Sequence, residues 1–299
     1  MSAREGVVIT STGNHCVVRT REGELHRCQL RGRRGTRPVC GDWVSWQALE
    51  QGGVIEAIQT RRNVLERGDF RGHPHALAAN IDRLLLVIAP SPSPDPLLMD
   101  RYAVLAHALE LPLSIWVNKI DTSQRSAALT QTTAPYTRFG IKTLHGSALT
   151  GAGIDSLEAL TANETVILAG QSGVGKSSLT QRLIPHLELR VGEISTISGQ
   201  GRHTTSTTTW FARPQGGALI DSPGVRTLRL DHLSAKAVLQ GFPEIAAAAP
   251  QCRFRDCQHR QEPDCAVKHA IATGDITSQR LENWRLLSAE ATQTTATSR

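Results

Sequence analysis

Short segments of alternating apolar and polar positions make up the first 65 residues, and glycine-rich turns separate them. Residues 6–11, 15–20, 23–30, 38–49 and 53–59 have this pattern, which favours β-strands with one buried face. Five such strands without an intervening helical period predict a small β-barrel. The OB-fold is the commonest nucleic-acid-binding barrel of this kind, and an SH3-like barrel fits the pattern almost equally well.

Beyond residue 80 the pattern changes to continuous apolar runs that alternate with segments of helical period. Residues 82–90 and 164–170 are apolar runs typical of buried strands, whereas residues 96–110 repeat apolar positions at the helical period. This alternation predicts a parallel α/β sheet. Further strands are expected within 113–121, 137–148 and 216–225, and further helices within 153–162 and 281–290.

The 299 residues exceed one typical domain, so the fold class expected is multidomain. We expect an OB-fold barrel at 1–66, a linker at 67–80 and a central α/β domain at 81–230. A mostly helical, metal-binding domain at 231–290 and a disordered tail at 291–299 would complete the chain. The sequence has no apolar run of 18 residues and no apolar signal core at its start, which predicts a cytoplasmic protein without a membrane partner.

Positive charge is densest near the N-terminus. The net charge is +6, and residues 1–79 hold 12 arginines, no lysine and 8 acidic residues. The run RGRRGTR at 31–37 suggests a contact with a phosphate backbone. An ordinary solvated loop explains the run equally well.

The run GQSGVGKSS at 170–178 matches the phosphate-loop pattern GxxxxGK[ST], between an apolar strand and the start of a helix. Its glycines let backbone N–H groups and the helix N-terminus face an anion. Lys176 would reach the β- and γ-phosphates, and the Ser177 hydroxyl would bind Mg²⁺. A turn that binds nothing explains this context poorly, and the loop alone leaves ATP and GTP both open. The binding residues expected here are Gly170, Gln171, Ser172, Gly173, Val174, Gly175, Lys176, Ser177 and Ser178.

The run Asn118-Lys119-Ile120-Asp121 follows an apolar strand and has the pattern of a guanine-recognition motif. A carboxylate accepts hydrogen bonds from N1–H and the exocyclic amine of guanine, whereas adenine presents an acceptor at N1. A buried Asp121 would be unpaired against adenine, and such sites discriminate by roughly 10⁴–10⁵. Asn118 would brace the loop and the other edge of the base, and the Lys119 stem would cover the base's face.

Three further segments complete the expected nucleotide site. Ser147 and Ala148 follow the next strand and resemble a loop that contacts the guanine oxygen. Asp221 and Gly224 form a DxxG element, in which Asp221 would hold Mg²⁺ through water and the Gly224 N–H would sense the γ-phosphate. The polar stretch 199–209 lies where a switch loop belongs, and its Thr205, favoured over Thr204, would complete the Mg²⁺ shell.

The guanine motif precedes the phosphate loop, which reverses the familiar order of these motifs. Read cyclically, from 164 to 225 and then from 81 to 163, the motifs regain the usual GTPase order. A nucleotide site at the carboxyl ends of parallel strands depends on where its loops lie in space. Because domain termini often lie close together, we interpret residues 81–230 as a circularly permuted GTPase domain.

A second cluster predicts a metal site. Cys252, Cys257, His259 and Cys265 fall within 14 residues and can close a tetrahedral site for one structural zinc ion. Three unrelated cysteines near an exposed histidine explain this crowding poorly. The other three cysteines, Cys16, Cys28 and Cys40, lack metal spacing and are interpreted as small buried apolar residues.

The whole constellation resembles the RsgA (YjeQ/EngC) family of circularly permuted GTPases. The resemblance is carried by GDWVSW, AANIDRLLLV, NKID, GQSGVGKSSL, GRHTT, DSPGVR, GFPEI and CRFRDCQHRQEPDCAV. It covers about residues 6–290 and implies an OB-fold, a permuted GTPase domain and a zinc-binding C-terminal domain. It also implies GTP hydrolysis stimulated by the small ribosomal subunit, contact with its rRNA and a role in late maturation. The switch departs from the family pattern at Ser206, and the continuation TLRL after DSPGVR lacks the expected acidic and aromatic residues.

No motif identifies the group that would orient the attacking water. Val225 occupies the place of the usual water-orienting glutamine, and a hydrocarbon cannot orient water. His203 is the internal candidate for this role, while an RNA or structural contact is its alternative. A P-loop kinase or ATPase, and a passive RNA-binding chaperone in which nucleotide is mainly structural, remain as alternative functions. We expect a monomer.

Overall fold

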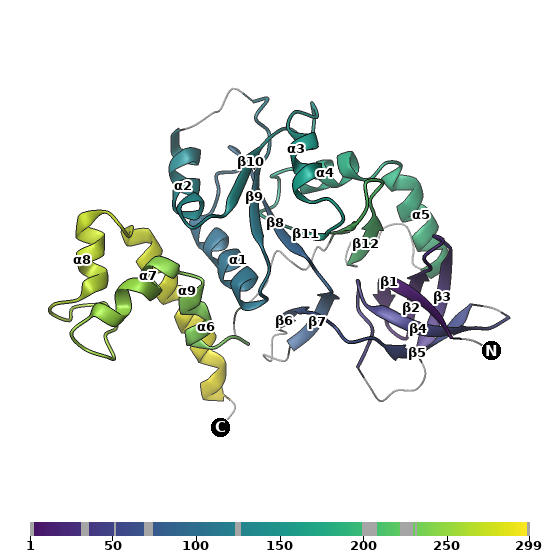
Figure 1. The fold of residues 1–299 in the computed structure, drawn as a ribbon, viewed down its shortest axis with the longest axis horizontal. Coiled ribbons are helices and arrows are strands. Elements are labelled where there is room, and N and C mark those ends of the chain that lie inside the picture. Colours follow the sequence, from purple (N-terminus) through teal and green to yellow (C-terminus); the bar gives the residue numbers. More distant parts are fainter. Residues whose placement is uncertain are drawn as a thin grey trace.

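The computed structural model describes residues 3–30, 36–50, 52–68, 74–122, 127–198, 208–221, 230 and 232–297. Three units follow one another along the chain (Figure 1). A β-barrel and a group of C-terminal helices lie on opposite sides of a central sheet that is covered by helices.

The N-terminal unit is a closed barrel with the strand order β1-β2-β3-β5-β4. Antiparallel ladders join most neighbours, and the parallel pair β3–β5 closes the barrel. Val44, Trp46 and Cys28 are fully buried in its core, which follows from the alternation of the strands. This topology confirms the OB-fold expectation. The strands are β1 Arg4–Thr12, β2 His15–Arg19, β3 Leu25–Leu30, β4 Trp43–Ala48 and β5 Gly53–Ile58.

A hairpin follows the barrel, in the region where the sequence predicts a linker. Strands β6 (Val64–Gly68) and β7 (Pro74–Ala79) pair antiparallel. The hairpin is fixed to the barrel because the Ala79 N–H donates to the Cys40 carbonyl at 2.9 Å. Gly41 has φ +89°, and a Cβ there would lie 2.2 Å from the Ala79 oxygen. This close approach requires glycine, so the segment 67–80 is partly an ordered hairpin.

The central unit is a six-stranded sheet with the order β10-β9-β8-β11-β13-β12. All neighbours are parallel except β12 and β13. Counted cyclically from β11, the order becomes 6-5-4-1-3-2, with the phosphate-loop strand in the middle. The strands are β8 Arg83–Ile88, β9 Leu113–Val117, β10 Lys142–His145, β11 Thr165–Ala169, β12 Thr209–Ala212 and β13 Ala218–Asp221.

Helices cover both faces of this sheet (Figure 1). Leu84 and Leu86 of β8 contribute to the core on one face, and Leu85 and Val87 to the core on the other, as the two-residue period of a strand requires. Helices α1 (Pro96–Ala108) and α2 (Ala127–Arg138) pack on the first face. Helices α3 (Ile154–Leu160) and α4 (Lys176–Leu183) pack on the second.

The barrel contacts the central unit through α5 (Leu187–Ser198) and β12. Val17 of the barrel belongs to an apolar cluster against which Ile194 and Ile197 of α5 and Trp210 of β12 pack. The barrel is therefore anchored to two elements that flank residues 199–208 in the sequence.

The strand order fixes where a ligand can bind. Strands β8 and β11 are parallel neighbours, but β8 leads towards β9 whereas β11 leads to the β13 side. Such a reversal is a topological switch point, and ligands of open α/β sheets bind outside the carboxyl ends of the strands there. The loops that follow Ile88 and Ala169 flank this crevice.

The C-terminal unit is helical, as the sequence predicts. Its core includes Val238, Phe242 and Leu287, and it packs against Val104 of α1. Helix α9 continues to Thr297, so most of the segment 291–299 is helical where the sequence predicts disorder. The elements are α6 Ala235–Gln240, α7 Pro243–Ala248, a 3₁₀ turn Ala249–Gln251, α8 Ala266–Thr273 and α9 Ser278–Thr297. Among the described residues, no helix combines the length and the apolar character needed to cross a membrane.

Candidate nucleotide site and metal centre

The predicted phosphate loop lies between β11 and α4, at the switch point. Gly170 has φ +131°, and a Cβ there would lie 2.1 Å from the Val87 oxygen. Only glycine allows the loop to pass this close to β8. Helix α4 begins at Lys176, so the loop ends at a helix N-terminus, whose N–H groups and dipole favour an anion.

The lysine and serines of the loop occupy the positions that the sequence predicts. The Lys176 ammonium donates hydrogen bonds to the carbonyls of Gly170 at 2.6 Å and Gln171 at 2.5 Å, which keeps the charge inside the loop. Ser177 and Ser178 are exposed in the first turn of α4. Their hydroxyls are therefore accessible to a ligand.

Asn118 connects the guanine-recognition motif to two neighbouring loops. Its side-chain Nδ2 donates to the Val174 carbonyl of the phosphate loop at 2.9 Å. Its Oδ1 accepts from the Ala148 N–H at 2.9 Å. Asn118 is only 2% exposed, so one buried amide joins three loops from three different strands. The structure thereby brings together the guanine motif, the phosphate loop and the Ser147–Ala148 loop that the sequence predicts separately.

Lys119 adds a second link to the phosphate loop. It has φ +61°, and its ammonium donates to the Gly173 carbonyl at 2.6 Å and the Ser91 carbonyl at 2.9 Å. The Lys119 ammonium thus ties the guanine-recognition motif to the phosphate loop and to the segment that follows β8. Thr122 closes the following turn, since its hydroxyl donates to the Lys119 carbonyl at 2.8 Å.

The carboxylate of the motif differs from the expectation in one respect. A buried Asp121 is expected from the sequence, but Asp121 is exposed. A base that seats here would itself have to cover the carboxylate. Ile120 is half-buried and packs against the core beneath α1 and α2.

The loop after β10 is the third of the loops that Asn118 joins. Ser147 is fully buried, and Ala148 is 8% exposed. The Ser147 Oγ accepts from the Thr150 N–H at 3.1 Å, which closes a tight turn. The hydrogen bond from the Ala148 N–H to Asn118 joins this loop to the guanine-recognition motif.

Asp221 ends β13, next to the phosphate-loop strand β11. The chain thereby places its carboxylate at the same edge of the sheet as Lys176 and Ser177. Gly224, Thr205 and His203 lie outside the described residues. Their expected contacts with the γ-phosphate, Mg²⁺ and the attacking water therefore remain predictions.

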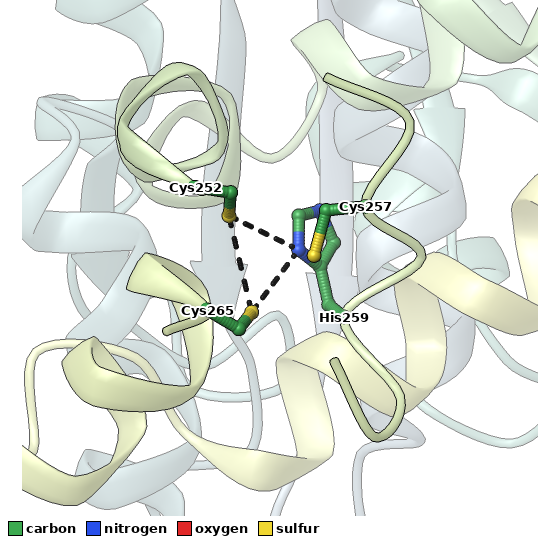
Figure 2. A group of neighbouring side chains, drawn as sticks. All are labelled: Cys252, Cys257, His259 and Cys265. Atoms are coloured by element: carbon green, nitrogen blue, oxygen red, sulfur yellow. Dashed lines mark hydrogen bonds between the residues drawn. The ribbon is translucent and has the colours of Figure 1, made fainter. Parts of the chain in front are cut away.

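The four predicted metal ligands converge in the C-terminal unit (Figure 2). Their ligand atoms all lie within 4.8 Å of one another. The His259 Nδ1 lies 3.4 Å from the Cys265 Sγ and 3.6 Å from the Cys252 Sγ, and the two sulfurs are 3.9 Å apart. Tetrahedral zinc with ordinary bond lengths places such ligand atoms about 3.5–3.8 Å from one another. The donor set, together with the three distances among Cys252, His259 and Cys265, is therefore suited to one zinc ion.

Local contacts hold these ligands in place. His259 has φ +57°, and its loop is tied because Glu262 accepts from the N–H groups of Gln258 at 2.8 Å and Arg260 at 2.7 Å. The Arg285 guanidinium donates to the His259 carbonyl. Burial lowers the pKa of His259, which favours the neutral imidazole that a metal binds.

Trp116 lies against the candidate nucleotide site, and the sequence alone does not single it out. Its indole N–H donates to the Asn118 Oδ1 at 3.3 Å, and the side chain is fully buried. Trp116 lies on β9, two positions before Asn118, which directly follows the strand, so strand alternation places both side chains on the same side. The two-residue spacing from Asn118 is the signal that the sequence offers. It does not distinguish Trp116 from the other apolar residues of the strand.

Comparisons with known proteins agree with this geometry. A family model described as RsgA GTPase matches residues 58–231. A protein of Actinobacillus pleuropneumoniae named small ribosomal subunit biogenesis GTPase RsgA is 40% identical over 292 residues, which cover 95% of this chain and 84% of that protein. A protein of the same name from Chromohalobacter salexigens is 44% identical over 264 residues, covering 88% of this chain and 77% of the relative.

Two solved structures share the fold over almost the whole chain. The crystal structure of YjeQ from Thermotoga maritima is 29% identical, has a TM-score of 0.76, and covers 97% of this chain and 99% of its own. The structure of YloQ, described as a circularly permuted GTPase, is 26% identical with a TM-score of 0.71, covering 98% of this chain and 96% of its own. A permuted order of motifs, one shared nucleotide crevice and the family match lead to one conclusion: the chain belongs to the RsgA GTPase family.

Proposed function

We propose that this protein hydrolyses GTP and acts in the biogenesis of the small ribosomal subunit. Membership of the RsgA GTPase family and the names of its relatives support this function. The observation that carries the proposal is the buried Asn118 amide, which links the Val174 carbonyl of the phosphate loop to the Ala148 N–H of the base loop. One residue thus joins the place for the phosphates to the place for the base.

Guanine is the base that suits this crevice. Asp121 offers an acceptor that pairs with the N1–H and exocyclic amine of guanine, whereas adenine would place its own acceptor against the carboxylate. The Lys119 stem, fixed at Ser91 and Gly173, would cover the face of the base. These side chains select GTP over ATP.

Side chains of this chain would hold the triphosphate for in-line attack by water. Lys176 and the N-terminus of α4 would neutralise charge on the β- and γ-phosphates. Ser177, Thr205 and, through water, Asp221 would hold Mg²⁺, which supplies further neutralisation of the phosphates when bound. The Gly224 N–H would contact the γ-phosphate.

The water-positioning group determines the rate. Because Val225 stands where a glutamine would orient the water, turnover is slow alone and increases when the small ribosomal subunit supplies or positions a polar group. His203 is the internal group proposed for this role. If His203→Ala retains full stimulated turnover and still binds the subunit, His203 takes no part in the chemistry.

The barrel and the C-terminal unit would contact rRNA, and the protein would act as a cytoplasmic monomer. Cys252, Cys257, His259 and Cys265 would hold one structural zinc ion, which stabilises the C-terminal unit. Hydrolysis of GTP would control release from the subunit. The coupling is supported by Leu230, which follows the DxxG segment: its N–H donates to Glu290 of α9 at 2.7 Å, and Glu290 also pairs with Arg101 of α1 at 2.6 Å.

One experiment tests the function and its alternatives. GTP and ATP turnover are measured with and without purified small subunits, together with subunit binding in the presence of a GTP analogue or GDP. Stimulated GTP turnover and tighter binding with the analogue are expected. Subunit binding with no stimulated turnover would favour an RNA-binding assembly chaperone with structural nucleotide, and efficient ATP use would favour a kinase or ATPase.

A further inference from the structure

Trp116 is a fully buried aromatic residue whose polar indole N–H faces the guanine-recognition motif. It lies on β9, and its indole N–H donates to the Asn118 Oδ1 at 3.3 Å. A buried indole N–H that forms a hydrogen bond gains a directional contact that a phenylalanine could not provide. At position 116 the indole therefore contributes a hydrogen bond in addition to filling apolar volume.

The hydrogen bonds around Asn118 fix which way its amide points. Two donors, the Trp116 indole and the Ala148 N–H, converge on the Oδ1. The Nδ2 then faces the Val174 carbonyl, to which it donates. If the amide were flipped, its NH₂ group would face the two N–H donors and its oxygen would face the Val174 carbonyl. The surroundings therefore exclude the flipped orientation.

The indole ring also shapes the base loop. A Cβ at Gly146 would lie 2.0 Å from the Trp116 Cη2, so the ring fills the space under the loop that leads to Ser147 and Ala148. A Cβ at Gly175 would lie 2.3 Å from the Asn118 Nδ2. Glycines at both positions let the base loop and the phosphate loop close on the Trp116–Asn118 pair.

We propose that Trp116 is a positioning residue for guanine-nucleotide binding, which acts by holding the Asn118 amide between the base loop and the phosphate loop. The inference rests on the proposed function, since it concerns the same nucleotide. It predicts that loss of the indole N–H weakens binding of GDP and GTP alike. The chemical step is unaffected, because Trp116 lies behind the base side of the site.

The variant Trp116→Phe keeps an aromatic ring and removes the N–H. Loss of one hydrogen bond predicts a roughly three- to tenfold weaker affinity for GDP and GTP, a KM for GTP raised by the same factor and an unchanged kcat. Trp46→Phe is the matched control. Trp46 is also fully buried, but its indole nitrogen has no hydrogen-bond partner among the described residues, and it lies in the barrel.

A double-mutant cycle separates positioning from a general loss of stability. If Trp116 acts through Asn118, Trp116→Phe weakens GDP binding in the wild-type background but adds no further loss to Asn118→Ala. Additive losses, or an affinity equal to that of Trp46→Phe, would overturn the inference. Wild-type protein that binds neither GDP nor GTP would instead contradict the proposed function.

Where Trp116→Phe does not fold, the indole ¹⁵N–¹H signal of Trp116 answers the same question. The hydrogen bond to Asn118 predicts that Asn118→Ala shifts this signal and leaves the indole signal of Trp46 in place. An unshifted Trp116 signal would exclude the proposed role.

Discussion

Arg280 of helix α9 forms a buried ion pair with Asp100 of helix α1, 180 positions away in the sequence. The two side chains are 6% and 0% exposed. Arg280 also pairs with Glu244 at 2.5 Å, and its guanidinium lies 4.4 Å from the ring centre of Phe242. Asn283 donates a further hydrogen bond to Asp100 at 2.7 Å. These contacts fix the C-terminal unit on the helix layer of the GTPase domain.

Removal of one partner should expose the strength of this attachment. Arg280→Ala leaves the Asp100 carboxylate buried without its cation, and we expect a loss of about 3–5 kcal/mol in the free energy of unfolding, measured with denaturant. Arg253→Ala is the control, since its pair with Asp264 is 62% and 69% exposed and is expected to contribute less than about 1 kcal/mol. Equal effects of the two changes would contradict a structural role for Arg280.

Chelation should destabilise the C-terminal unit selectively. The wild type is expected to carry one zinc ion per chain by elemental analysis, and removal of the metal should lower the melting temperature of the C-terminal unit. Cys265→Ala should lose the metal, because three ligands remain of a closed tetrahedral set. Cys40→Ala is the matched control, since Cys40 is a buried cysteine of the barrel region. Metal content unchanged in Cys265→Ala would exclude the site.

The barrel should lose stability as the pH rises above about 8.5. Cys16 and Cys28 stand opposite each other on β2 and β3, and burial raises the pKa of each thiol to about 12. In the unfolded chain these thiols ionise near pH 8.5. The folded form therefore keeps protons that the unfolded form has released, and stability that is fully present below about pH 8.5 falls as the pH rises towards about 12.

The slope contributed by each of these two thiols is at most about 1.4 kcal/mol per pH unit. The slope is obtained by measuring the free energy of barrel unfolding at several pH values between about pH 8 and about pH 10.5. The double variant Cys16→Ala/Cys28→Ala should be less stable at neutral pH and show a flatter decline. A decline as steep as that of the wild type would show that other groups cause it.

The phosphate loop should not tolerate a Cβ at its entrance. In Gly170→Ala the new methyl meets the Val87 oxygen, and the residue is held at φ +131°, so nucleotide affinity should fall at least about tenfold. Gly192→Ala is the control in α5, where a Cβ meets nothing within 4 Å and helix propensity favours alanine by roughly 0.5–1 kcal/mol. Binding of a fluorescent GDP analogue distinguishes the two. Undiminished binding by Gly170→Ala would show that the loop does not hold the phosphates.

Base selection should depend on the charge of Asp121. Asp121→Asn replaces one acceptor with an amide donor, so affinity for GTP should fall while affinity for xanthosine triphosphate, which has a carbonyl at C2, should rise. We expect the wild type to prefer GTP over xanthosine triphosphate by a factor of roughly 10⁴ or less. Larger factors belong to buried sites, whereas Asp121 is exposed. A proportional loss for both nucleotides would mean that Asp121 does not read the base.

Periodicity in the sequence predicts the elements whose stability comes from one buried face. The barrel strands and the strands β8, β9 and β11 fall where the apolar pattern places them, and the nucleotide motifs meet because parallel strands end at one edge. Helix α2 is not predicted, since its sequence AALTQTTAPYTR contains threonines and a proline. It forms because Leu129 and Tyr136 pack against the sheet, and that tertiary contact has no local signature.

The interactions between distant residues could not be predicted either. Asp100 and Arg280 are ordinary charged positions within helical segments, and only the packing of α1 against α9 buries them. The Trp116–Asn118 hydrogen bond requires a rotamer that strand alternation does not specify. The close approach of Gly41 to Ala79 of β7 has the same character, because it depends on where the barrel and the hairpin meet.

The position of β11 in the sheet also sets the order in which the sheet can be assembled during synthesis. Strand β8 pairs on one side with β9, which follows it closely, and on the other side with β11, which begins only at Thr165. A growing chain therefore carries β8, with its apolar sequence RLLLVI, as an open edge until residues 89–164 have been made. Open apolar edges pair readily with other chains. The permutation thus makes β8 the strand whose edge stays open, whereas the unpermuted order of the same strands would leave β11 waiting for β8.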